Sequence, residues 1–430
     1  MNDHPVLAEL AQAGMRLGLP RMRSFLAWLG DPHLRYPVIH VAGTNGKGSV
    51  TRMVAAMLEA HGLRVGVTTS PHLQHVNERI RIGRTPIPDA ELDALLTRLQ
   101  REVRAWVAAE PPEDPAEAAV PLTWFEASVA AAFLHFADAR VDVAVVEVGL
   151  GGRLDATNVV APVATAVVTV GLDHTEQLGP DHASIAAEKA GVFKPGVPAV
   201  VGPVPHAALA VLRAVAAQVG APFSAFGDTF DAGGVAVDFA YRGPGVAREG
   251  LALSLEGDHQ VANAAVALRL VDVLPAHLRP SEPAIRAGLR LARNRGRLER
   301  LAPDLVVDGA HNADGAAVLA AWLAARPRAH RVLVLGAGGD KDVRAVVLAL
   351  APHVDEILTT RCAHPRARDP EALAGAVRDA VGGGLPVRAA GAVEHALPLA
   401  RSRAEERGGE VIVAGSLFLV GAVRDLLGLD

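Results

Sequence analysis

The sequence predicts an α/β protein with two domains, each built on a mainly parallel sheet. A chain of 430 residues is too long for one ordinary hydrophobic core, and half of its residues are hydrophobic, enough to fill two. Valine-rich runs of strand length alternate with alanine- and leucine-rich runs of helical length, which is typical of doubly wound α/β folds. We therefore expect a larger domain over residues 1–296 and a smaller one over residues 297–430.

The strands expected in the larger domain are short and bounded by glycine or proline. Because both of their faces are apolar, they suit a parallel sheet that is covered on both sides. These strands are expected at residues 37–42, 64–69, 141–148, 163–170 and 198–202, with helices such as 50–61 and 123–137 between them. Residues 110–120, rich in proline, glutamate and alanine, are interpreted as an exposed connector, and the glycine-rich stretch 222–256 as an antiparallel flap on the edge of the sheet.

A second series of strands follows a charged segment with a central glycine at residues 293–299, which we interpret as the interdomain linker. Strands of this smaller domain are expected at residues 305–307, 331–336, 356–360, 386–389 and 410–414. Apolar periodicity continues between them, as expected for a second α/β unit.

The composition disfavours several classes of protein. The 42 Lys and Arg residues are balanced by 47 Asp and Glu residues, and the resulting net charge of −5 disfavours a general binder of nucleic acid or anionic membranes. The single cysteine, Cys362, excludes an internal disulfide and fits a reducing compartment. No signal peptide is evident at the N-terminus, and no apolar run approaches the roughly 20 residues of a membrane span. We expect a cytoplasmic protein without nucleic-acid or membrane partners.

The turn after the first expected strand carries the most information. Its residues are Gly43, Thr44, Asn45, Gly46, Lys47, Gly48 and Ser49. Backbone amides at such a turn can surround phosphate oxygens, and the following helix directs its positive end at them. The lysine would add a mobile charge, and the Ser49 hydroxyl could face Mg²⁺. The common phosphate loop has a glycine where this chain has Val41, so this is a shorter variant; an ordinary glycine-rich turn is the alternative.

Polar residues also follow several other strands, where the carboxyl ends of an α/β sheet face the ligand crevice. Glu147 ends a valine-rich run and could hold Mg²⁺, although a salt-bridged strand end is the alternative. His174 follows the next strand and could serve a metal or be an ordinary satisfied polar group. Ser70 follows the second strand. Asp308 and His311 end the first strand of the smaller domain, so polar groups are expected on both sides of an interdomain cleft, with turn and capping roles as the alternative.

Lys189 lies near the end of an expected helix, where a cation complements the helix dipole. On the sequence pattern alone it is interpreted as a surface residue.

The motifs together resemble the folylpolyglutamate synthase/dihydrofolate synthase family of the Mur ligase superfamily. The matching segments occur in order at residues 43–49, 69–73, 78–80, 147–158, 172–175, 188–191, 257–260, 263–265, 296–299, 308–312, 340–342 and 415–417. The resemblance implies a central phosphate-loop domain and a C-terminal Rossmann-like domain. It also implies a reaction in which MgATP phosphorylates a carboxylate and the amine of L-glutamate then attacks the acyl phosphate.

Site residues are carried over from the family residue by residue. The resemblance implies that ATP contacts the 43–49 turn together with Asn263, Arg297 and Asp308, and that His311 lies near the phosphates. It implies two Mg²⁺ ions, served by Ser70, Glu147, His174 and a carbamylated Lys189. The folate substrate is expected against Arg79, Thr123, Phe125, Glu126, Gly152, Leu154, Asp155 and Ala156. The residues expected to take part in catalysis are Lys47, Asp155, His174, Lys189 and His311.

Three alternatives remain beside this interpretation. Other Mur ligases generally carry an extra domain before the phosphate loop, whereas 42 residues precede Gly43 here. A regulatory or transport ATPase would need neither the second domain nor the glycine-rich 149–158 loop. Within the family, residues 122–126 and 154–156 resemble segments that contact dihydropteroate, which favours a bifunctional enzyme over one that extends only reduced folates. Residues 9–15 are expected to contribute to that pocket, and the resemblance favours a monomer.

Overall fold

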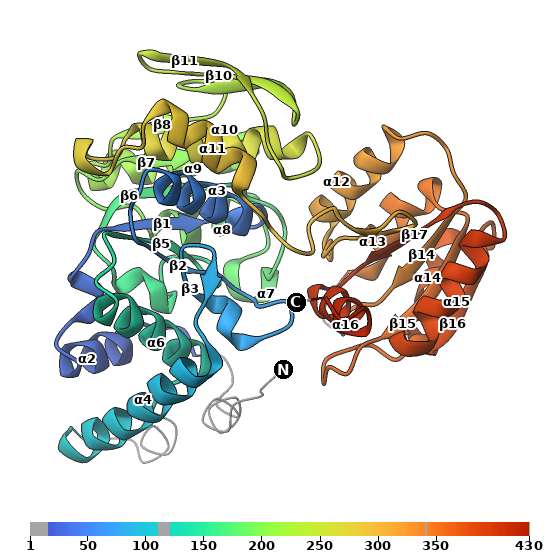
Figure 1. Ribbon diagram of the computed structural model, residues 1–430, viewed down its shortest axis with the longest axis horizontal. Coiled ribbons are helices and arrows are strands. Elements are labelled where there is room, and N and C mark those ends of the chain that lie inside the picture. The colour runs from blue at the N-terminus through green and yellow to red at the C-terminus, as the bar shows by residue number, and fades with distance from the viewer. Residues whose placement is uncertain (1–15, 111–120, 340–341, 430) are drawn as a thin grey trace. The chain divides into compact units, whose positions relative to one another are not determined.

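The computed structural model describes residues 16–110, 121–339 and 342–429, which form two compact units (Figure 1). The first unit takes in the described residues up to Ser254 and the segment Gln260–Arg293. The second unit comprises Leu255–His259 and the described residues from Asn294 onward. The chain therefore passes between the units within the predicted linker and also on either side of the short segment Leu255–His259.

The described part of the first unit contains an eight-stranded sheet in the order β4-β3-β2-β5-β1-β6-β7-β8. Its strands are β1 Val38–Ala42, β2 Val65–Thr68, β3 Ile80–Ile82, β4 Thr85–Pro86, β5 Val143–Glu147, β6 Pro162–Val167, β7 Ala199–Val201 and β8 Phe223–Ala225. The neighbouring pairs β2–β5, β5–β1, β1–β6, β6–β7 and β7–β8 are parallel. Strand β3 pairs antiparallel with both β2 and β4. This confirms the predicted, mainly parallel α/β sheet.

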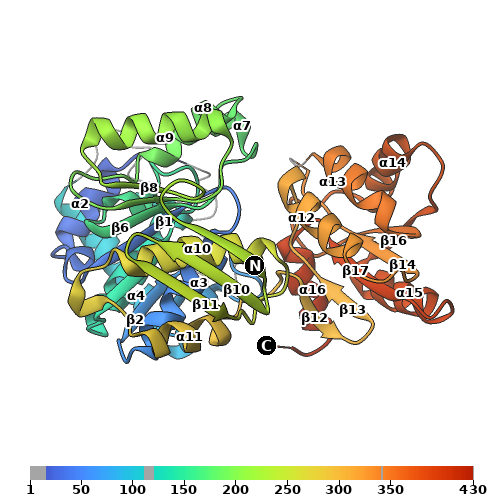
Figure 2. The same ribbon diagram turned by 90° about the horizontal axis from the view of Figure 1, so that it is seen from above.

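Helices cover both faces of this sheet (Figure 2). One face carries α3 Lys47–Ala60, α10 His259–Asp272 and α11 Glu282–Leu291. The other carries α2 Pro20–Trp28, α4 Asp89–Ala109, α6 Trp124–Asp138, α7 Thr175–Leu178, α8 His182–Ala190 and α9 His206–Val219. Short 3₁₀ segments are η1 Pro32–Leu34, η2 Val76–Arg79, η3 Ala156–Val159 and η4 Ala276–Leu278. Central strand residues such as Val38 and Val146 are fully buried, as their apolar runs predict.

Residues 222–256, which were predicted to form an antiparallel flap, do so only in part. Residues 223–225 form β8, a parallel strand of the main sheet. The antiparallel part is a separate sheet of β9 Asp231–Val235, β10 Asp238–Gly243 and β11 Val246–Leu251, beside α10 and α11 (Figure 1). Arg248 on β11 fixes it there, because its guanidinium donates to Asp272 of α10 and to Glu282 of α11 at 2.8 Å each.

The second unit is a six-stranded sheet in the order β12-β13-β17-β14-β15-β16 over the described residues. Its strands are β12 Glu299–Ala302, β13 Leu305–Val307, β14 Arg331–Leu335, β15 Glu356–Arg361, β16 Val387–Ala392 and β17 Glu410–Ala414. All pairs are parallel except β12 with β13. Its helices are α12 Ala313–Ala324, α13 Val343–Leu350, α14 Pro370–Val381, α15 Val393–Glu405 and α16 Leu417–Leu426, with η5 Ala351–His353. In Figure 2, α12, α13 and α14 cover one face of this sheet and α15 and α16 the other.

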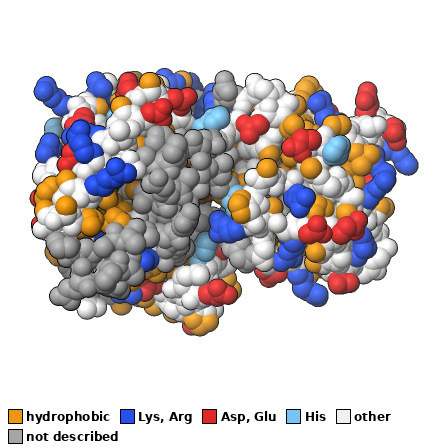
Figure 3. Space-filling view, turned by 90° about the horizontal axis from the view of Figure 1, so that it is seen from below, with side chains coloured by type: hydrophobic (Ala, Val, Ile, Leu, Met, Phe, Trp, Pro, Cys, Tyr) orange, Lys and Arg blue, Asp and Glu red, His pale blue; other side chains and the backbone are white. Residues whose placement is uncertain are grey.

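Two predicted segments, residues 9–15 and most of the connector at 110–120, lie outside the described residues. Within the described ranges, none of the helices combines the length and the apolar character that crossing a membrane requires. On the face drawn in Figure 3, basic and acidic side chains are interspersed over each unit, in keeping with the near balance of charges in the composition.

Candidate active site

The turn after β1 has the geometry of a phosphate loop. Gly46 adopts a left-handed φ of 81°, and α3 begins at the next residue, Lys47. A helix N-terminus and its free backbone amides form an anion site. The Lys47 ammonium folds back over the turn and donates to the carbonyl oxygens of Gly43 at 3.0 Å and Thr44 at 3.2 Å. The turn therefore places a cation directly over amides that could receive phosphate.

Thr44 and Asn45 fix this turn to the segment that follows β6. The Thr44 amide donates to the Thr169 carbonyl, and its hydroxyl pairs with the backbone of Gly171. The Asn45 amide donates to the Thr169 hydroxyl at 2.9 Å, and that hydroxyl donates back to the Asn45 carbonyl. The expected strand 163–170 consequently ends at Val167, because the residues after it bind the phosphate loop instead of continuing the sheet.

Asn263 on α10 lies directly against the phosphate loop, as a nucleotide role requires. A Cβ atom on Gly46 would lie 2.6 Å from the Asn263 Oδ1 atom, so this position has room only for glycine. The Asn263 amide is held by a 2.9 Å hydrogen bond to the Gln260 Oε1 atom. The structure thus brings two sequence-predicted ATP residues together from segments more than two hundred residues apart.

Glu147 and Ser70 meet at the carboxyl ends of β5 and β2. Glu147 is the last residue of β5 and is buried, and its Oε2 atom accepts the Ser70 amide at 3.2 Å. A carboxylate beside a hydroxyl-bearing residue supplies the hard oxygen donors that Mg²⁺ prefers. These two residues fit a magnesium site in the chemistry of their donors.

His174 lies on the loop that follows β6 and is exposed. It has a left-handed φ of 52° and precedes α7. Its Nε2 atom lies 3.9 Å from a carboxylate oxygen of Asp173. The described residues contain no cluster of three or more His, Cys, Asp or Glu side chains that could hold a metal by itself.

Lys189 is buried, with a relative exposure of 2%, so its interpretation as a surface residue was wrong. Burial, followed by the nearby Lys47 ammonium, lowers the Lys189 pKa to about 7, although Asp173 and Asp155 act in the opposite direction. The amine therefore lies near the phosphate-loop lysine and two acidic residues, of which Asp155 was predicted as a site residue. With this pKa, about half of the amine is neutral at pH 7, and the neutral form can act as a nucleophile or ligand.

Asp155 organises the glycine-rich loop between β5 and η3. Its Oδ2 atom accepts the Leu150 amide at 2.8 Å, and its Oδ1 atom accepts the Thr157 amide at 3.0 Å and the Thr157 hydroxyl at 2.5 Å. The hydroxyl in turn lies 2.8 Å from the Nε2 atom of His40 on β1. Burial raises the pKa of Asp155, and these hydrogen bonds oppose that rise. The carboxylate is buried and saturated with donors from its own loop.

The same loop is attached to the end of α8 that carries Lys189. The Arg153 amide donates to the Glu188 carbonyl at 2.8 Å, and the two side chains also form an ion pair. A Cβ atom on Gly152 would lie 2.9 Å from the Lys189 carbonyl oxygen, which explains the glycine. Asn158, which sequence reasoning did not single out, donates to the Gly191 carbonyl at 3.0 Å and accepts the Lys194 ammonium at 2.8 Å. Its position at the end of a matching motif was the available signal.

The predicted folate residues fall into two groups. Thr123 and Glu126 form a capping box at the start of α6, with the Glu126 amide donating to the Thr123 hydroxyl at 3.2 Å and the Thr123 amide donating to Glu126 at 2.8 Å. Phe125 is half-buried, and its ring occupies the space where a side chain on Gly149 would lie, 2.4 Å from a Cβ atom. The structure thereby puts α6 against the glycine-rich loop, with Leu154 and Ala156 following on that loop.

Arg79 forms the other group with residues of the loop after β2. Its Nε atom donates to the His72 Nδ1 atom at 2.9 Å, and its guanidinium lies 4.4 Å from the centre of the Trp124 ring. Burial lowers the Arg79 pKa to about 10, while Glu147 and Glu78 act to raise it. Arg79 therefore remains cationic at neutral pH, close enough to Glu147 to sense its charge.

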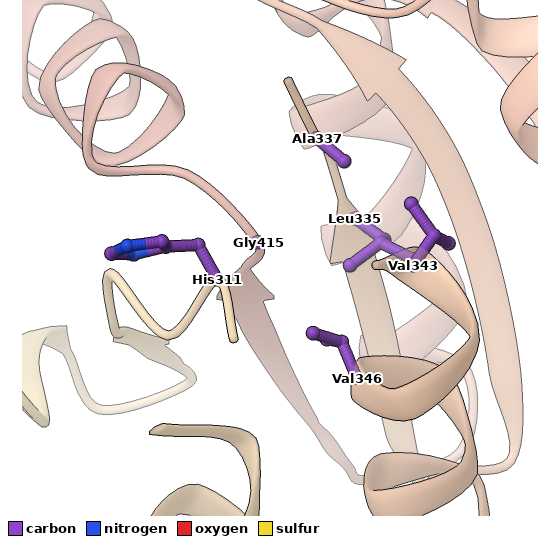
Figure 4. Close-up of a pocket in the computed structure, with 6 residues that line it drawn as sticks. All are labelled: His311, Leu335, Ala337, Val343, Val346 and Gly415. Carbon is purple, nitrogen blue, oxygen red and sulfur yellow. The ribbon is translucent and has the colours of Figure 1, made fainter. Parts of the chain in front are cut away.

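In the second unit, the residues after β13 form a compact polar group. Asp308 accepts the amides of Leu298 at 2.8 Å and Ala310 at 2.7 Å. Burial raises its pKa, whereas the Arg297 cation and these amides lower it. The His311 Nδ1 atom lies 2.7 Å from the Gly309 carbonyl, so this nitrogen carries a proton in the neutral ring. His311 also borders a small, mostly apolar pocket (Figure 4) lined by His311, Leu335, Ala337, Val343, Val346 and Gly415.

Comparisons with known proteins decide the family. Residues 296–417 match the model of the Mur ligase glutamate ligase domain. The chain is 38% identical to the dihydrofolate synthase/folylpolyglutamate synthase of Mycobacterium tuberculosis, over 96% of this chain and 90% of that protein. The chain belongs to the dihydrofolate synthase/folylpolyglutamate synthase family.

Solved structures of the family agree with this fold over the whole chain. The folylpolyglutamate synthase of M. tuberculosis, complexed with ADP and AMPPCP, matches with a TM-score of 0.90 and 36% identity, covering 99% of each chain. A bifunctional folylpolyglutamate synthase/dihydrofolate synthase with Mn, AMPPNP and L-glutamate bound matches with a TM-score of 0.85 and 32% identity, covering 100% of this chain and 99% of that one. The sequence resemblance and the predicted Mur ligase fold are thus confirmed, and the chain is an ATP-dependent ligase of this family.

Proposed function

We propose that this member of the dihydrofolate synthase/folylpolyglutamate synthase family adds L-glutamate to dihydropteroate and to reduced folates, consuming ATP and releasing ADP and phosphate. The observation that carries the proposal is the gathering of a phosphate loop, a buried carboxylate at Glu147 and a buried amine at Lys189 in one unit. A phosphate loop alone supports nucleotide binding, whereas the added buried groups suit phosphoryl transfer to a carboxylate.

The reaction is proposed to proceed in two steps. A carboxylate oxygen of the folate attacks the γ-phosphorus of ATP, the bond to the β-phosphate oxygen breaks, and ADP leaves. The neutral amine of glutamate then attacks the acyl carbon, an amide C–N bond forms, the nitrogen releases one proton, and phosphate leaves with the oxygen of the acyl group. Lys47 and the amides of the 43–49 turn hold the phosphates and stabilise the charge that develops on them.

Ser70, Glu147, His174 and a carbamylated Lys189 are proposed to serve two Mg²⁺ ions. When bound, magnesium would neutralise charge on the phosphates, which this site's oxygen donors suit. Carbamylation requires the neutral amine, whose nitrogen bonds to the carbon of CO₂ and releases a proton. A Lys189 pKa of about 7 supplies that neutral form at physiological pH. We propose that Asn263, Arg297, Asp308 and His311 complete the nucleotide site.

The folate is proposed to contact Arg79, Thr123, Phe125, Glu126 and the loop residues Gly152, Leu154, Asp155 and Ala156. Asp155 would act mainly by shaping that loop, since its carboxylate oxygens accept donors from residues 150 and 157. The protein is proposed to act in the cytoplasm as a monomer, with a larger domain over residues 1–296 and a smaller one over residues 297–430.

The decisive test is ADP release by the purified protein with each substrate omitted in turn. We expect sustained ADP release to require both L-glutamate and a folate-type acid, because the folate acid accepts the phosphoryl group and glutamate then removes the acyl phosphate. ADP release that is indifferent to both would contradict ligase activity.

Bifunctionality needs a separate comparison. ADP release is measured with ATP, L-glutamate and either dihydropteroate or tetrahydrofolate. We expect glutamate-dependent turnover with each of the two acids. If dihydropteroate gives no glutamate-dependent turnover, the protein is a folylpolyglutamate synthase alone, which is the alternative activity.

A further inference from the structure

Glu78 is a buried acidic residue that the proposed reaction does not use. It lies in η2 with 7% of its side chain exposed. Its Oε1 atom accepts the amides of Gln74 at 2.8 Å and His75 at 3.0 Å, and its Oε2 atom accepts the Leu73 amide at 3.1 Å. One carboxylate thus binds three successive backbone amides, which is a specific arrangement and not a chance surface contact.

The turn held in this way, residues 70–75, contacts two parts of the candidate active site. At its start, the Ser70 amide donates to the Glu147 carboxylate at 3.2 Å. Two residues on, the His72 ring accepts a hydrogen bond from the Arg79 Nε atom, and the Arg79 guanidinium lies over the Trp124 ring. The 70–75 turn therefore connects the proposed magnesium ligand Glu147 to Arg79, a proposed folate-binding residue.

Glutamine cannot replace this carboxylate without loss. Its side-chain oxygen accepts hydrogen bonds, but its nitrogen only donates, so at least one of the three amides would face a donor. A buried amide without an acceptor destabilises the folded turn, and the turn would avoid this loss by moving. Aspartate keeps the charge but is shorter by one methylene, so it reaches fewer of the amides.

We propose that Glu78 is a positioning residue whose carboxylate fixes the 70–75 turn and thereby sets the affinity for the metal–nucleotide complex and for the folate together. This inference rests on the proposed function, since Ser70, Glu147 and Arg79 take their roles from it. No contact between Glu78 and a substrate is involved.

The test compares Glu78→Gln and Glu78→Asp with a matched control, Asp369→Asn. Asp369 also accepts backbone amides, from Glu371 at 3.0 Å and Ala372 at 3.1 Å, but it caps α14 in the second unit. Binding of Mn²⁺ in the presence of a non-hydrolysable ATP analogue is measured by electron paramagnetic resonance. The folate KM, kcat and thermal midpoint are measured on the same preparations.

We expect about tenfold weaker Mn²⁺ binding in Glu78→Gln, the scale of outer-ligand substitutions around metals. The folate KM should rise with it while kcat changes less, and Glu78→Asp should lie between this variant and the unchanged protein. Asp369→Asn should leave Mn²⁺ binding unchanged and change stability little, because one oxygen of Asp369 accepts both amides and asparagine keeps that acceptor at the N-cap.

Unchanged Mn²⁺ affinity in folded Glu78→Gln would overturn the proposal and leave Glu78 a purely structural residue. If Glu78→Gln does not fold, unchanged Mn²⁺ affinity in Glu78→Asp would overturn the proposal in the same way. Failure of the proposed function can be told apart from failure of this proposal. The first would appear as a lack of glutamate-dependent turnover in the unchanged protein, whereas the Glu78 proposal is judged by Mn²⁺ binding, which is measured without turnover.

Discussion

The Lys189 amine is buried, lies in the electrostatic range of Lys47, Asp155 and Asp173, and has a pKa lowered to about 7. A lysine in water stays protonated to far higher pH and reacts poorly with CO₂. Desolvation is the largest cause of the change, so the chemistry of this residue depends on how the glycine-rich loop and α8 pack around it.

Lys189→Ala is therefore expected to lower ligase activity by about 10²–10³-fold, the range for removing one electrostatic contributor to a transition state. Short carboxylic acids should restore part of the activity by supplying the missing carboxylate. The measurement is ADP release with and without added acetate or formate, and the unchanged protein should not respond to the acids. Full activity in the variant would mean that Lys189 has no catalytic role.

Sequence reasoning gave the right position for residues at the end of a predicted strand and the wrong one where the position depends on packing between distant segments. Glu147 was expected at a buried strand end and lies there. Lys189 was expected at the surface, because a helical pattern does not reveal what covers the helix end. Asn158 was missed for the same reason, since its partners Gly191 and Lys194 are distant in sequence.

The phosphate loop and α3 behave as one element. Gly46 has a left-handed φ, and the space beside its Cα atom is filled by Asn263 and by Val168, whose Cγ1 atom would lie 2.9 Å from a Cβ atom. The glycine is thus required by backbone conformation and by close packing together.

Gly46→Ala and Gly62→Ala separate these two requirements. Both glycines have a positive φ, but nothing lies within 4 Å of a Cβ atom on Gly62, just beyond the other end of α3. Each substitution should cost about 1–2 kcal/mol of unfolding free energy through backbone strain. Gly46→Ala should cost more and should also weaken ATP binding. Chemical denaturation and nucleotide titration check this, and equal ATP affinity in the two variants would contradict the account.

Element boundaries could be predicted where valine runs are long and buried, as in β1, β5 and β14. The antiparallel edge strands β3, β4 and β12 were not predicted, because they are two to four residues long and carry little periodic signal. The flap boundary was misplaced because β8 pairs with the main sheet and β9 with β10, and the pattern of short strands does not show which strand each one pairs with.

At the scale of the whole molecule, the proposed nucleotide residues are divided between the units. Gly43–Ser49 and Asn263 belong to the first unit, and Arg297, Asp308 and His311 to the second. The proposal therefore requires that the affinity for ATP depend on residues of both.

Arg297→Ala should weaken nucleotide binding by about tenfold or more, since a hydrogen bond to a charged group contributes about 1.5–3 kcal/mol. Arg300→Ala is the control, because this exposed arginine on β12 donates to the Pro303 carbonyl at 2.8 Å and has no proposed nucleotide role. Titration with a fluorescent ATP analogue measures both affinities. Equal affinities of the two variants for the ATP analogue would show that Arg297 is not part of the nucleotide site.

The central claim is that the chain forms an amide through an acyl phosphate. Its most direct test supplies dihydropteroate, or tetrahydrofolate, whose reacting carboxyl group is labelled with ¹⁸O, together with MgATP and L-glutamate. Mass spectrometry of the released phosphate reports where the label goes. Phosphate carrying one ¹⁸O atom is predicted, because the carboxylate oxygen that attacks the γ-phosphorus leaves with it. Unlabelled phosphate during amide formation would contradict the account.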